Sequence, residues 1–121
     1  MVKIEAGDTL CRPKGIVTHV GIAMPNGMVY HNAPGRGEHI STFKEFANGK
    51  VVQVRKPKSS VRSVIMQRLD KEKNISRKYS AFGNNCEHSV SRINNGTPSS
   101  PQLIAGMIIG GFALYQLLKA K

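Results

Sequence analysis

Two apolar stretches on either side of a turn form the clearest pattern in the chain. Val17–Met24 is rich in β-branched and apolar residues, which predicts a strand that contains His19. Pro25–Gly27 follows as a turn, because Asn and Gly tolerate positive φ at the central positions of a tight hairpin. Met28–His31 is then predicted as the return strand. The pattern therefore predicts two histidines on neighbouring antiparallel strands, able to share a face but not directly opposite each other.

Two more strands are predicted by shorter apolar runs. A turn at Gly7–Asp8 leads into a strand that begins at Thr9 and ends at Pro13, since proline has no N–H for a ladder. The β-branched residues of Val51–Arg55 predict another strand. Between this strand and the hairpin, the glycines and the proline of residues 32–39 predict a loop.

Capping and spacing signals predict two helices in the middle of the chain. Thr42 and Glu45 form a capping box, which opens a short helix that Asn48 ends. Apolar residues at helical spacing predict a longer helix over residues 60–73, and they are Val61, Val64, Ile65 and Leu69.

A third helix is predicted to begin at Cys86. Asn85 is a preferred N-cap, because its side-chain oxygen accepts a hydrogen bond from the first helical turn, and Val90 and Ile93 supply an apolar face. Together the elements predict an α+β domain. In it, an antiparallel sheet of four or five strands packs on the helix that carries Cys86.

The same placement makes Cys86 a candidate nucleophile. The positive end of a helix dipole favours a thiolate, so a lowered pKa is expected for this thiol. Thiol catalysis also needs a base and a polar residue that orients the base. A single histidine in a strand is more often structural, but two of the four histidines fall on one hairpin. His19 and His31 are therefore candidate site residues beside Cys86.

The charge balance indicates an anionic partner. The 121 residues include 18 Lys and Arg against 7 Asp and Glu, a formal net charge of +11. Such a field attracts a membrane surface or a nucleic acid. Only 6% of the residues are aromatic and Trp is absent, so a base-stacking platform is poorly supported and nucleic acid is disfavoured. A phospholipid or membrane surface is the favoured partner.

The C-terminal residues differ in composition from the rest. Residues 98–102 are rich in Pro and Ser, which is typical of a linker between a domain over 1–97 and a tail over 103–121. Residues 103–118 are uncharged and would form a helix of about 24 Å, short of the roughly 30 Å of a bilayer core. We expect a short membrane anchor, an interfacial helix, or an element that docks on the domain. Self-association through residues 103–118 is a further alternative, since Gly106–Gly110 has a small-xxx-small pattern.

The cysteines and the N-terminus predict a cytoplasmic protein that associates with membranes through its tail. Two cysteines, Cys11 and Cys86, are too few for a disulfide framework, and they are not spaced as metal ligands usually are. No cofactor or metal is therefore expected, and Cys11 is predicted to be a half-buried strand thiol. Residues 1–5 are charged and lack an apolar core, so no secretory signal is expected.

Several short motifs carry a resemblance to a known family. Gly7–Asp8 opens a strand, His19 precedes a Gly-Ile-Ala strand, and Tyr30–Pro34 follows the hairpin turn. Asn85–His88, the block Asn-Cys-Glu-His, is the most specific motif. Together they resemble the lecithin:retinol acyltransferase-type domain over about residues 5–100. This family includes HRAS-like suppressor phospholipase/acyltransferases, bacterial relatives and the H-box/NC proteins of some picornaviruses.

The resemblance implies a circularly permuted papain-like (NlpC-type) fold, followed here by the hydrophobic C-terminal helix. It assigns Cys86 as nucleophile, His19 as general base and His31 as the residue that orients His19. It further implies that Cys86 takes an acyl group from a glycerophospholipid ester, forming an acyl-cysteine. Water, an amine or an alcohol then accepts that group. Ser89 departs from the family, which usually has an aromatic residue after the Asn-Cys-Glu-His block.

Two other functions fit the same residues. A thiol amidase or peptidase of the NlpC type would turn over soluble peptides without needing residues 103–118. A non-enzymatic interaction module, as in some viral relatives, would keep the cysteine and histidine positions but lack access for a substrate. In that case Cys86→Ala would leave the biological phenotype intact.

Overall fold

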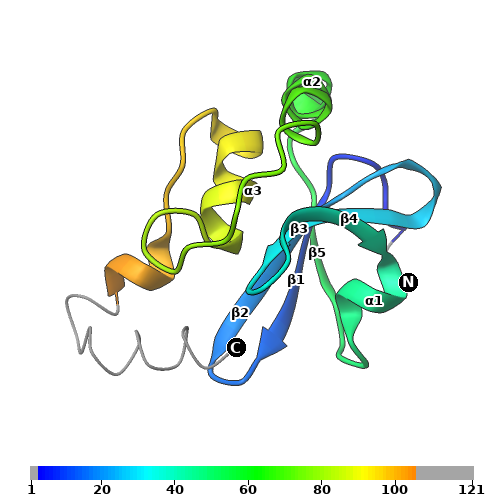
Figure 1. The fold of residues 1–121 in the computed structure, drawn as a ribbon. Helices are drawn as coiled ribbons and strands as arrows, with labels where there is room; N and C mark the ends of the chain where they lie inside the picture. The colour runs from blue at the N-terminus through cyan, green and yellow to red at the C-terminus, as the bar shows by residue number, and fades with distance from the viewer. Residues whose placement is uncertain (1–2, 106–121) are drawn as a thin grey trace.

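Antiparallel strands in the order β4-β3-β2-β1-β5 form one sheet, with helices on both sides (Figure 1). The structure is a computed structural model that describes residues 3–105. Within them the strands are β1 (Thr9–Lys14), β2 (Val17–Ala23), β3 (Met28–Ala33), β4 (Gly37–Thr42) and β5 (Gln53–Arg55). The helices are α1 (Phe43–Ala47), α2 (Arg62–Glu72) and α3 (Cys86–Asn95), with 3-10 turns at Pro25–Gly27 and Ser59–Val61. The predicted α+β class and antiparallel sheet are confirmed.

The β2-β3 hairpin agrees with the sequence pattern. Asn26 and Gly27 in the turn have φ angles of 64° and 74°, the positive values that favour these two residue types. Gly21 of β2 lies opposite His31 of β3. His19 is two residues before Gly21, so the two histidines share a face and stand diagonally across the pair.

The turn between β3 and β4 is shorter than the predicted loop over residues 32–39. Strand β3 continues to Ala33, which pairs directly with Gly37 at the start of β4. The loop prediction is therefore wrong, because the turn takes up only residues 34–36 and the remaining predicted loop residues belong to β3 and β4. This tight hairpin is what brings Glu38 and Ser41 beside the site described below.

Pro13 does not end β1, as the sequence predicted. It pairs with Thr18 of β2, and the strand continues to Lys14. The backbone N–H and C=O of Thr18 both bond to Gln102 on the side away from β1. Pro13 therefore occupies a position of this pair where a backbone N–H is not needed.

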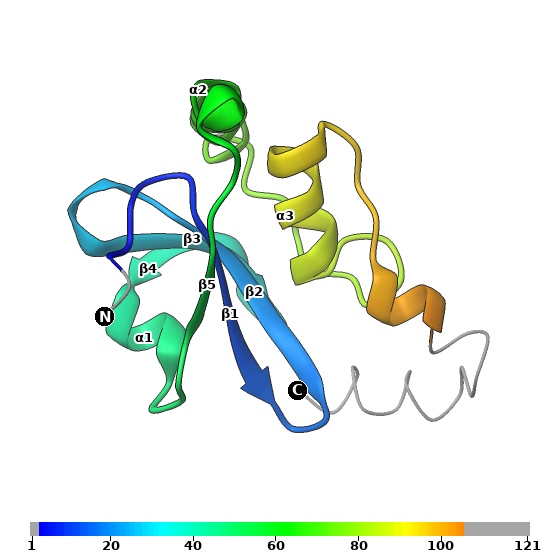
Figure 2. The same cartoon turned by 180° about the vertical axis from the view of Figure 1, so that it is seen from behind.

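Two apolar clusters fix the sheet between its helices. On one face, residues of β1, β2 and β3 pack against α2 and α3, and the cluster contains Cys11, Val20, Ile22, Tyr30, Ile65, Leu69, Val90 and Ile93. On the other face, Phe46 of α1 packs with Leu10, Ala23 and Val29. Figures 1 and 2 show α3 and α1 on opposite sides of the β1-β2 hairpin. The helix with Cys86 and the helix with Phe46 therefore cover different faces.

The predicted helices are largely confirmed. Thr42 caps α1 by accepting a hydrogen bond from the backbone N–H of Glu45 at 3.1 Å, and Asn48 ends the helix in the left-handed conformation. Helix α2 falls within the predicted residues 60–73, with Ile65 and Leu69 buried.

The segment expected to be a linker contacts the domain. Ser100 and Leu103 are buried, and residues 101–105 are helical. The rest of the expected tail, residues 106–121, lies outside the described residues. Within residues 3–105, no helix has both the length and the apolar character needed to cross a bilayer.

Candidate active site

Cys86 is the first residue of α3, held there by the cap that the sequence predicted. The side-chain oxygen of Asn85 accepts hydrogen bonds from the backbone N–H groups of Glu87 at 2.9 Å and His88 at 3.2 Å. His88 completes the capping box, since its Nδ1 accepts from the backbone N–H of Asn85 at 2.9 Å. His88 therefore fixes the helix start, and it does not line the cavity that contains Cys86.

Helix α3 begins in a gap between β2 and β3. The two strands pair only from Gly21 to Ala23 on β2. Beyond that point, Asn32 of β3 donates hydrogen bonds to the carbonyl oxygens of Asn84 at 2.7 Å and Asn85 at 3.4 Å. The separation of the strands thus makes room for the N-terminus of α3. Cys86 lies on the face covered by α3, whereas the His19 ring packs on Phe46 of α1 on the opposite face. Through this gap both residues line the same cavity.

Burial controls the protonation of Cys86. Its Sγ atom lies 3.9 Å from the carbonyl oxygen of Thr18, to which the thiol can donate. Burial raises the pKa of this thiol, while hydrogen bonds from the backbone N–H groups of Val20 and Glu87 act in the opposite direction without offsetting it. The sequence-based expectation of a lowered pKa is wrong for this arrangement. Desolvation of a thiolate here outweighs the stabilisation from the helix N-terminus.

A chain of hydrogen bonds fixes the tautomers of the two histidines. The hydroxyl of Ser41 donates to the carbonyl oxygen of Thr42 at 3.0 Å, so its Oγ accepts from Nε2–H of His31 at 2.8 Å. A neutral imidazole has one N–H, so Nδ1 of His31 accepts from Nε2–H of His19 at 2.9 Å. The Nδ1 atom of His19 therefore keeps its lone pair, as a general base requires.

Aromatic packing and burial keep both imidazoles neutral. Phe46 stacks on His19 with ring centroids 5.3 Å apart, and it meets His31 edge-on at 5.1 Å. Burial lowers the pKa of His19 to about 2 and that of His31 to about 3, and each ring also feels nearby positive charge, with Arg12 acting on both. His39 lies with its ring centroid 4.2 Å from that of His31, tilted by 52°, and it bonds the Gly37 carbonyl.

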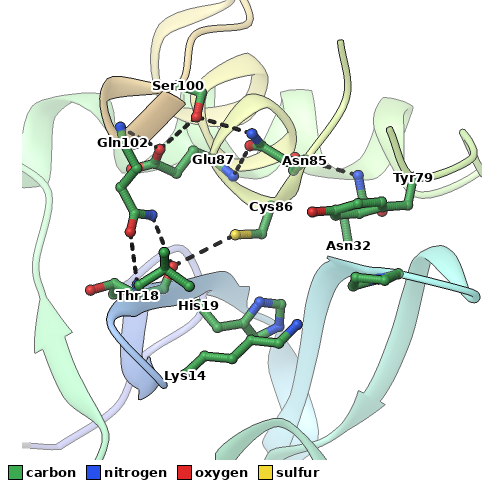
Figure 3. A pocket seen from close by; sticks show the side chains of 12 residues that line it. Lys14, Thr18, His19, Asn32, Tyr79, Asn85, Cys86, Glu87, Ser100 and Gln102 are labelled. Carbon is green, nitrogen blue, oxygen red and sulfur yellow. Dashed lines mark hydrogen bonds between the residues drawn. The ribbon is translucent and has the colours of Figure 1, made fainter. Parts of the chain in front are cut away.

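Cys86 and His19 line one small cavity, shown in Figure 3. Its volume is about 20 Å³, which is room for about one water molecule. In Figure 3 the hydroxyl of Tyr79 points toward Cys86. The other lining residues are Lys14, Val17, Thr18, Asn32, Pro34, Asn85, Glu87, Ser100 and Gln102. The structure thus brings two of the three predicted site residues to one cavity and connects the third, His31, behind His19.

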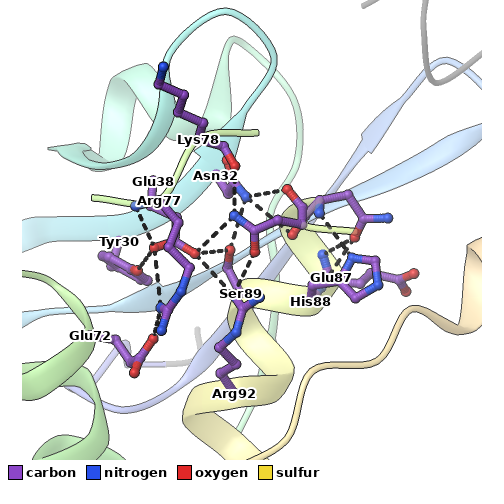
Figure 4. A network of polar contacts seen from close by, with 12 residues as sticks. Tyr30, Asn32, Glu38, Glu72, Arg77, Lys78, Glu87, His88, Ser89 and Arg92 are labelled. Atoms are coloured by element: carbon purple, nitrogen blue, oxygen red, sulfur yellow. Dashed lines mark hydrogen bonds and ion pairs between the residues drawn. The ribbon is translucent and has the colours of Figure 1, made fainter. Parts of the chain in front are cut away.

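A buried carboxylate holds the start of α3 against β4 (Figure 4). Glu38 accepts hydrogen bonds from the hydroxyls of Tyr30 and Ser89, both at 2.8 Å. It also accepts from Asn84 at 3.3 Å and from the guanidinium of Arg92 at 3.1 Å. Ser89 is buried and also accepts a hydrogen bond from Asn32 at 3.0 Å. A hydroxyl suits this position because both of its neighbours are polar.

Four residues near the site were not assigned a role from the sequence. Ser41 ends the histidine chain, and Tyr79 and Gln102 line the cavity. Asn32 also lines the cavity, and its side chain donates a hydrogen bond to Ser89. Within residues 3–105, the Oδ1 atom of Asn32 has no hydrogen-bond partner. The position of Asn32 directly after His31 is a sequence signal that could have marked it. The other three come to the site only through packing.

Cys11 does not line this cavity. Cys11 is buried in the core on β1, and both cysteines are free thiols. Among residues 3–105, no group of three or more His, Cys, Asp and Glu side chains is placed to hold a metal ion. Two cations of α2 are engaged within the domain. Arg62 pairs with buried Asp8 at 2.9 Å, and Arg68 donates to the carbonyl oxygen of Asn94 at 3.0 Å.

Comparison with known proteins leaves the family open. No protein-family model matches this sequence, and no curated protein is similar enough to be matched.

Proposed function

We propose that this protein is a cysteine-dependent acyltransferase or phospholipase A that works through an acyl-cysteine on Cys86. The observation that carries the proposal is the hydrogen-bond chain from Ser41 through His31 to His19. It leaves the lone pair of the His19 Nδ1 atom outside the chain, at the cavity that also contains the thiol. A nucleophile, a base and a residue that orients the base are the parts that this chemistry requires.

The reaction begins with both partners neutral. The thiol proton of Cys86 moves to Nδ1 of His19 as the sulfur attacks the carbonyl carbon of an ester. The carbon–oxygen bond of the ester then breaks, and the imidazolium gives its proton to the leaving alkoxide. Water, an amine or an alcohol next loses a proton to His19 and attacks the thioester. The carbon–sulfur bond of the thioester then breaks, which releases the acyl product. The leaving thiolate takes its proton back from the His19 imidazolium, which restores the thiol.

Two donors are suited to the oxyanion that forms on the carbonyl oxygen. The side chain of Asn85 binds the backbone N–H groups of Glu87 and His88, which leaves the N–H of Cys86 for the substrate. The hydroxyl of Tyr79 points toward Cys86 in Figure 3. Burial, followed by the nearby Cys86, raises the pKa of Tyr79 to about 12, so the hydroxyl keeps its proton at neutral pH.

Other observations support the fold assignment and the substrate class. An antiparallel sheet with the histidines, packed on a helix that begins with the cysteine, supports a circularly permuted papain-like fold of the lecithin:retinol acyltransferase type. The net charge of +11 and the uncharged stretch over residues 103–118 support a glycerophospholipid donor and association with a membrane surface.

Intact-mass spectrometry after incubation with a short-chain phosphatidylcholine tests this proposal. We expect the wild type to gain the mass of one acyl group, and we expect Cys86→Ala to gain none. Cys11→Ala is the matched control, because it removes the other thiol, and it should still be acylated. His19→Ala should be acylated much more slowly than the wild type.

Two results would contradict the lipid proposal. If no adduct and no free fatty acid form while iodoacetamide still labels Cys86, the donor is not a phospholipid ester. If Cys86 resists iodoacetamide even at alkaline pH, where its thiolate is more abundant, and the biological phenotype survives Cys86→Ala, a non-enzymatic interaction module is the better description.

A second candidate is an amide hydrolase of the NlpC type. One observation favours it, since a carboxamide group, that of Gln102, already lies beside Cys86 and bonds to the backbone of Thr18. The chemical steps are the same, with an amine as the leaving group in place of an alcohol.

A further inference from the structure

Three large apolar side chains are exposed near the cavity that contains Cys86. Ile16 is in the turn between β1 and β2, Phe82 is in the loop before α3, and Ile104 is in the short helix over residues 101–105. Their exposed fractions are 79%, 50% and 51%, in that order. A single exposed apolar side chain is common on a folded domain, whereas several around one site indicate a surface that binds a partner.

The three exposed residues border one apolar cluster. Each is the direct neighbour in the chain of one member of this cluster, which consists of Val17, Ala81 and Leu103. Val17 also lines the cavity, and Leu103 follows Gln102, which lines the cavity too. Figures 1 and 2 show the β1-β2 turn and residues 101–105 at the end of the domain that lies away from α2. The exposed side chains therefore stand beside the wall of the cavity.

Positive charge accompanies these apolar residues. Lys14 lines the cavity, and Lys78 is exposed at the start of the loop that leads to α3. Among the described residues that line the cavity, Glu87 is the one acid. Its carboxylate accepts hydrogen bonds from the hydroxyl of Ser100 at 2.7 Å and from the backbone N–H of Gln102 at 2.9 Å. Lysines beside exposed apolar side chains suit a surface of anionic lipid headgroups over hydrocarbon.

The segment that closes the cavity belongs to the same surface. The side chain of Gln102 bonds to the backbone N–H and C=O of Thr18 at 2.8 Å and 2.9 Å, and Leu103 is buried in the apolar cluster. The cavity of about 20 Å³ has room for about one water molecule and not for an ester. This segment must therefore move before a phospholipid reaches Cys86, and a bilayer in contact with Ile104 would lie directly against it.

The sequence continues from this surface into an uncharged stretch. The described residues end at position 105, directly after Ile104, and residues 103–118 carry no charge. Apolar residues that begin at the rim of the cavity, together with lysines on the same side, fit one kind of partner. That partner is the surface of a phospholipid bilayer.

We propose that Ile16, Phe82 and Ile104 form a docking surface for a phospholipid bilayer. The two lysines lie beside the headgroups, and the cavity with Cys86 faces the membrane. The inference rests on the phospholipid donor of the proposed function, because the bilayer is the source of that donor. It gives the domain itself, and not only residues 103–118, a share of the contact with the membrane.

A single tryptophan in the full chain tests the orientation. The sequence contains no Trp, so Ile16→Trp introduces its only indole, at a side chain that is already exposed. Ile75→Trp is the matched control, because Ile75 is 46% exposed and follows α2 at the other end of the domain. The probe is a vesicle of phosphatidylcholine and phosphatidylglycerol in equal amounts. We expect the emission of Ile16→Trp to shift to shorter wavelength and to be quenched by brominated phosphatidylcholine, and we expect neither change for Ile75→Trp.

A polar substitution tests how much the same side chain contributes to binding. Transfer of an isoleucine side chain out of water is favourable, so Ile16→Ser should weaken sedimentation with these vesicles about tenfold. Ile75→Ser should bind as the wild type does. Vesicles of phosphatidylcholine alone should bind the wild type more weakly, because the lysines then have no anionic headgroups beside them.

Several results would overturn the docking surface. Equal quenching of the two tryptophan variants would mean that the domain has no preferred orientation on the bilayer. Emission of Ile16→Trp that is already shifted without vesicles, and that brominated lipid does not quench, would mean that another part of the protein covers this surface.

Acylation of wild-type Cys86 by soluble short-chain phosphatidylcholine tests the proposed function separately, because it needs no vesicle. If acylation occurs and Ile16→Trp is not quenched on vesicles, the docking surface fails and the proposed function stands. If no acylation occurs, the proposed function fails, and the inference that rests on its phospholipid donor fails with it.

Discussion

The Nε2 atom of His31 lies 2.8 Å from the hydroxyl oxygen of Ser41, and this contact ends the chain that starts at His19. Ser41 comes from β4, a strand that the sequence did not predict, and its side chain is buried. Because its own proton bonds to the Thr42 carbonyl, Ser41 has only an acceptor to offer His31. Ser41 is thus a positioning residue that acts through His31.

Replacing Ser41 tests this role. In Ser41→Ala the buried N–H of His31 loses its acceptor, which costs about 1–3 kcal/mol and favours the other tautomer. We expect the rate of Cys86 acylation to fall roughly tenfold or more, with little change in KM. Ser41→Thr keeps the hydroxyl and should restore the rate, and Ser63→Ala on exposed α2 is the control. A change in stability alone, with an unchanged acylation rate, would contradict the role.

Gly21 should not tolerate a side chain. A Cβ atom there would lie 2.8 Å from Phe46 and 2.9 Å from Val29, so Phe46 would have to move away from the His19 ring on which it stacks. We expect Gly21→Ala to lower the free energy of unfolding by about 1–3 kcal/mol. Urea unfolding measures this loss. Gly83→Ala is the matched control, since its nearest neighbour would be 3.7 Å away, and similar losses in both variants would contradict the packing argument.

Stability should fall as the pH drops below about 6.5. Burial lowers the pKa of His19 and His31 in the folded state, so between the folded and unfolded values the unfolded chain binds more protons. Their contribution is complete above the unfolded pKa near 6.5 and is lost progressively toward acid pH. Each histidine contributes a slope of up to about 1.4 kcal/mol per pH unit.

Urea unfolding between pH 7 and 4.5 measures this slope. This pH window lies above the range in which Asp8 loses its contribution to stability. Burial alone would raise the pKa of Asp8, but hydrogen bonds with Lys56, Glu5 and Arg62 outweigh burial and hold the pKa below its usual value of 3.8. Burial also lowers the pKa of His88, so some slope should remain in His31→Gln. A slope in His31→Gln that equals that of the wild type would contradict a contribution from His31.

Loss of the Glu38 carboxylate should destabilise the start of α3. Removing one partner of a buried ion pair costs about 3–5 kcal/mol, because the other charge stays buried, and Arg92 is that partner. We therefore expect Glu38→Gln to lower the unfolding free energy by several kcal/mol, on the order of that range. Glu45→Gln is the control, since its ion pair with Arg36 is exposed and should contribute about 0–1 kcal/mol. Equal effects in the two variants would argue against the buried network.

Cys86 should react slowly with iodoacetamide at neutral pH. Burial raises the pKa of this thiol, so the reactive thiolate is scarce at pH 7 and becomes more abundant as the pH rises. Peptide mapping by mass spectrometry distinguishes Cys86 from Cys11. Labelling of Cys86 at pH 7 that is faster than labelling of a free cysteine would contradict the pKa direction.

Several local features were correctly predicted from the sequence. The β2-β3 hairpin depends on strand-forming residues on either side of a turn at Asn26 and Gly27. Strand propensity and turn formation are both local, because they involve residues close together in the chain. The caps at Thr42 and Asn85 are similar, because a side chain bonds to backbone groups only two or three residues away. These signals were enough to place Cys86 at a helix N-terminus and the two histidines on one face.

The tertiary structure alone decided how these parts meet. The gap between β2 and β3 that admits Cys86, the acceptor that Ser41 supplies, and the position of Gln102 all join residues far apart in sequence. The pKa of Cys86 illustrates the reason. The helix N-terminus is a local property that could be predicted, but the burial that outweighs it depends on packing of the whole domain. Sequence thus determined which groups are available, and packing determined their surroundings and their contacts.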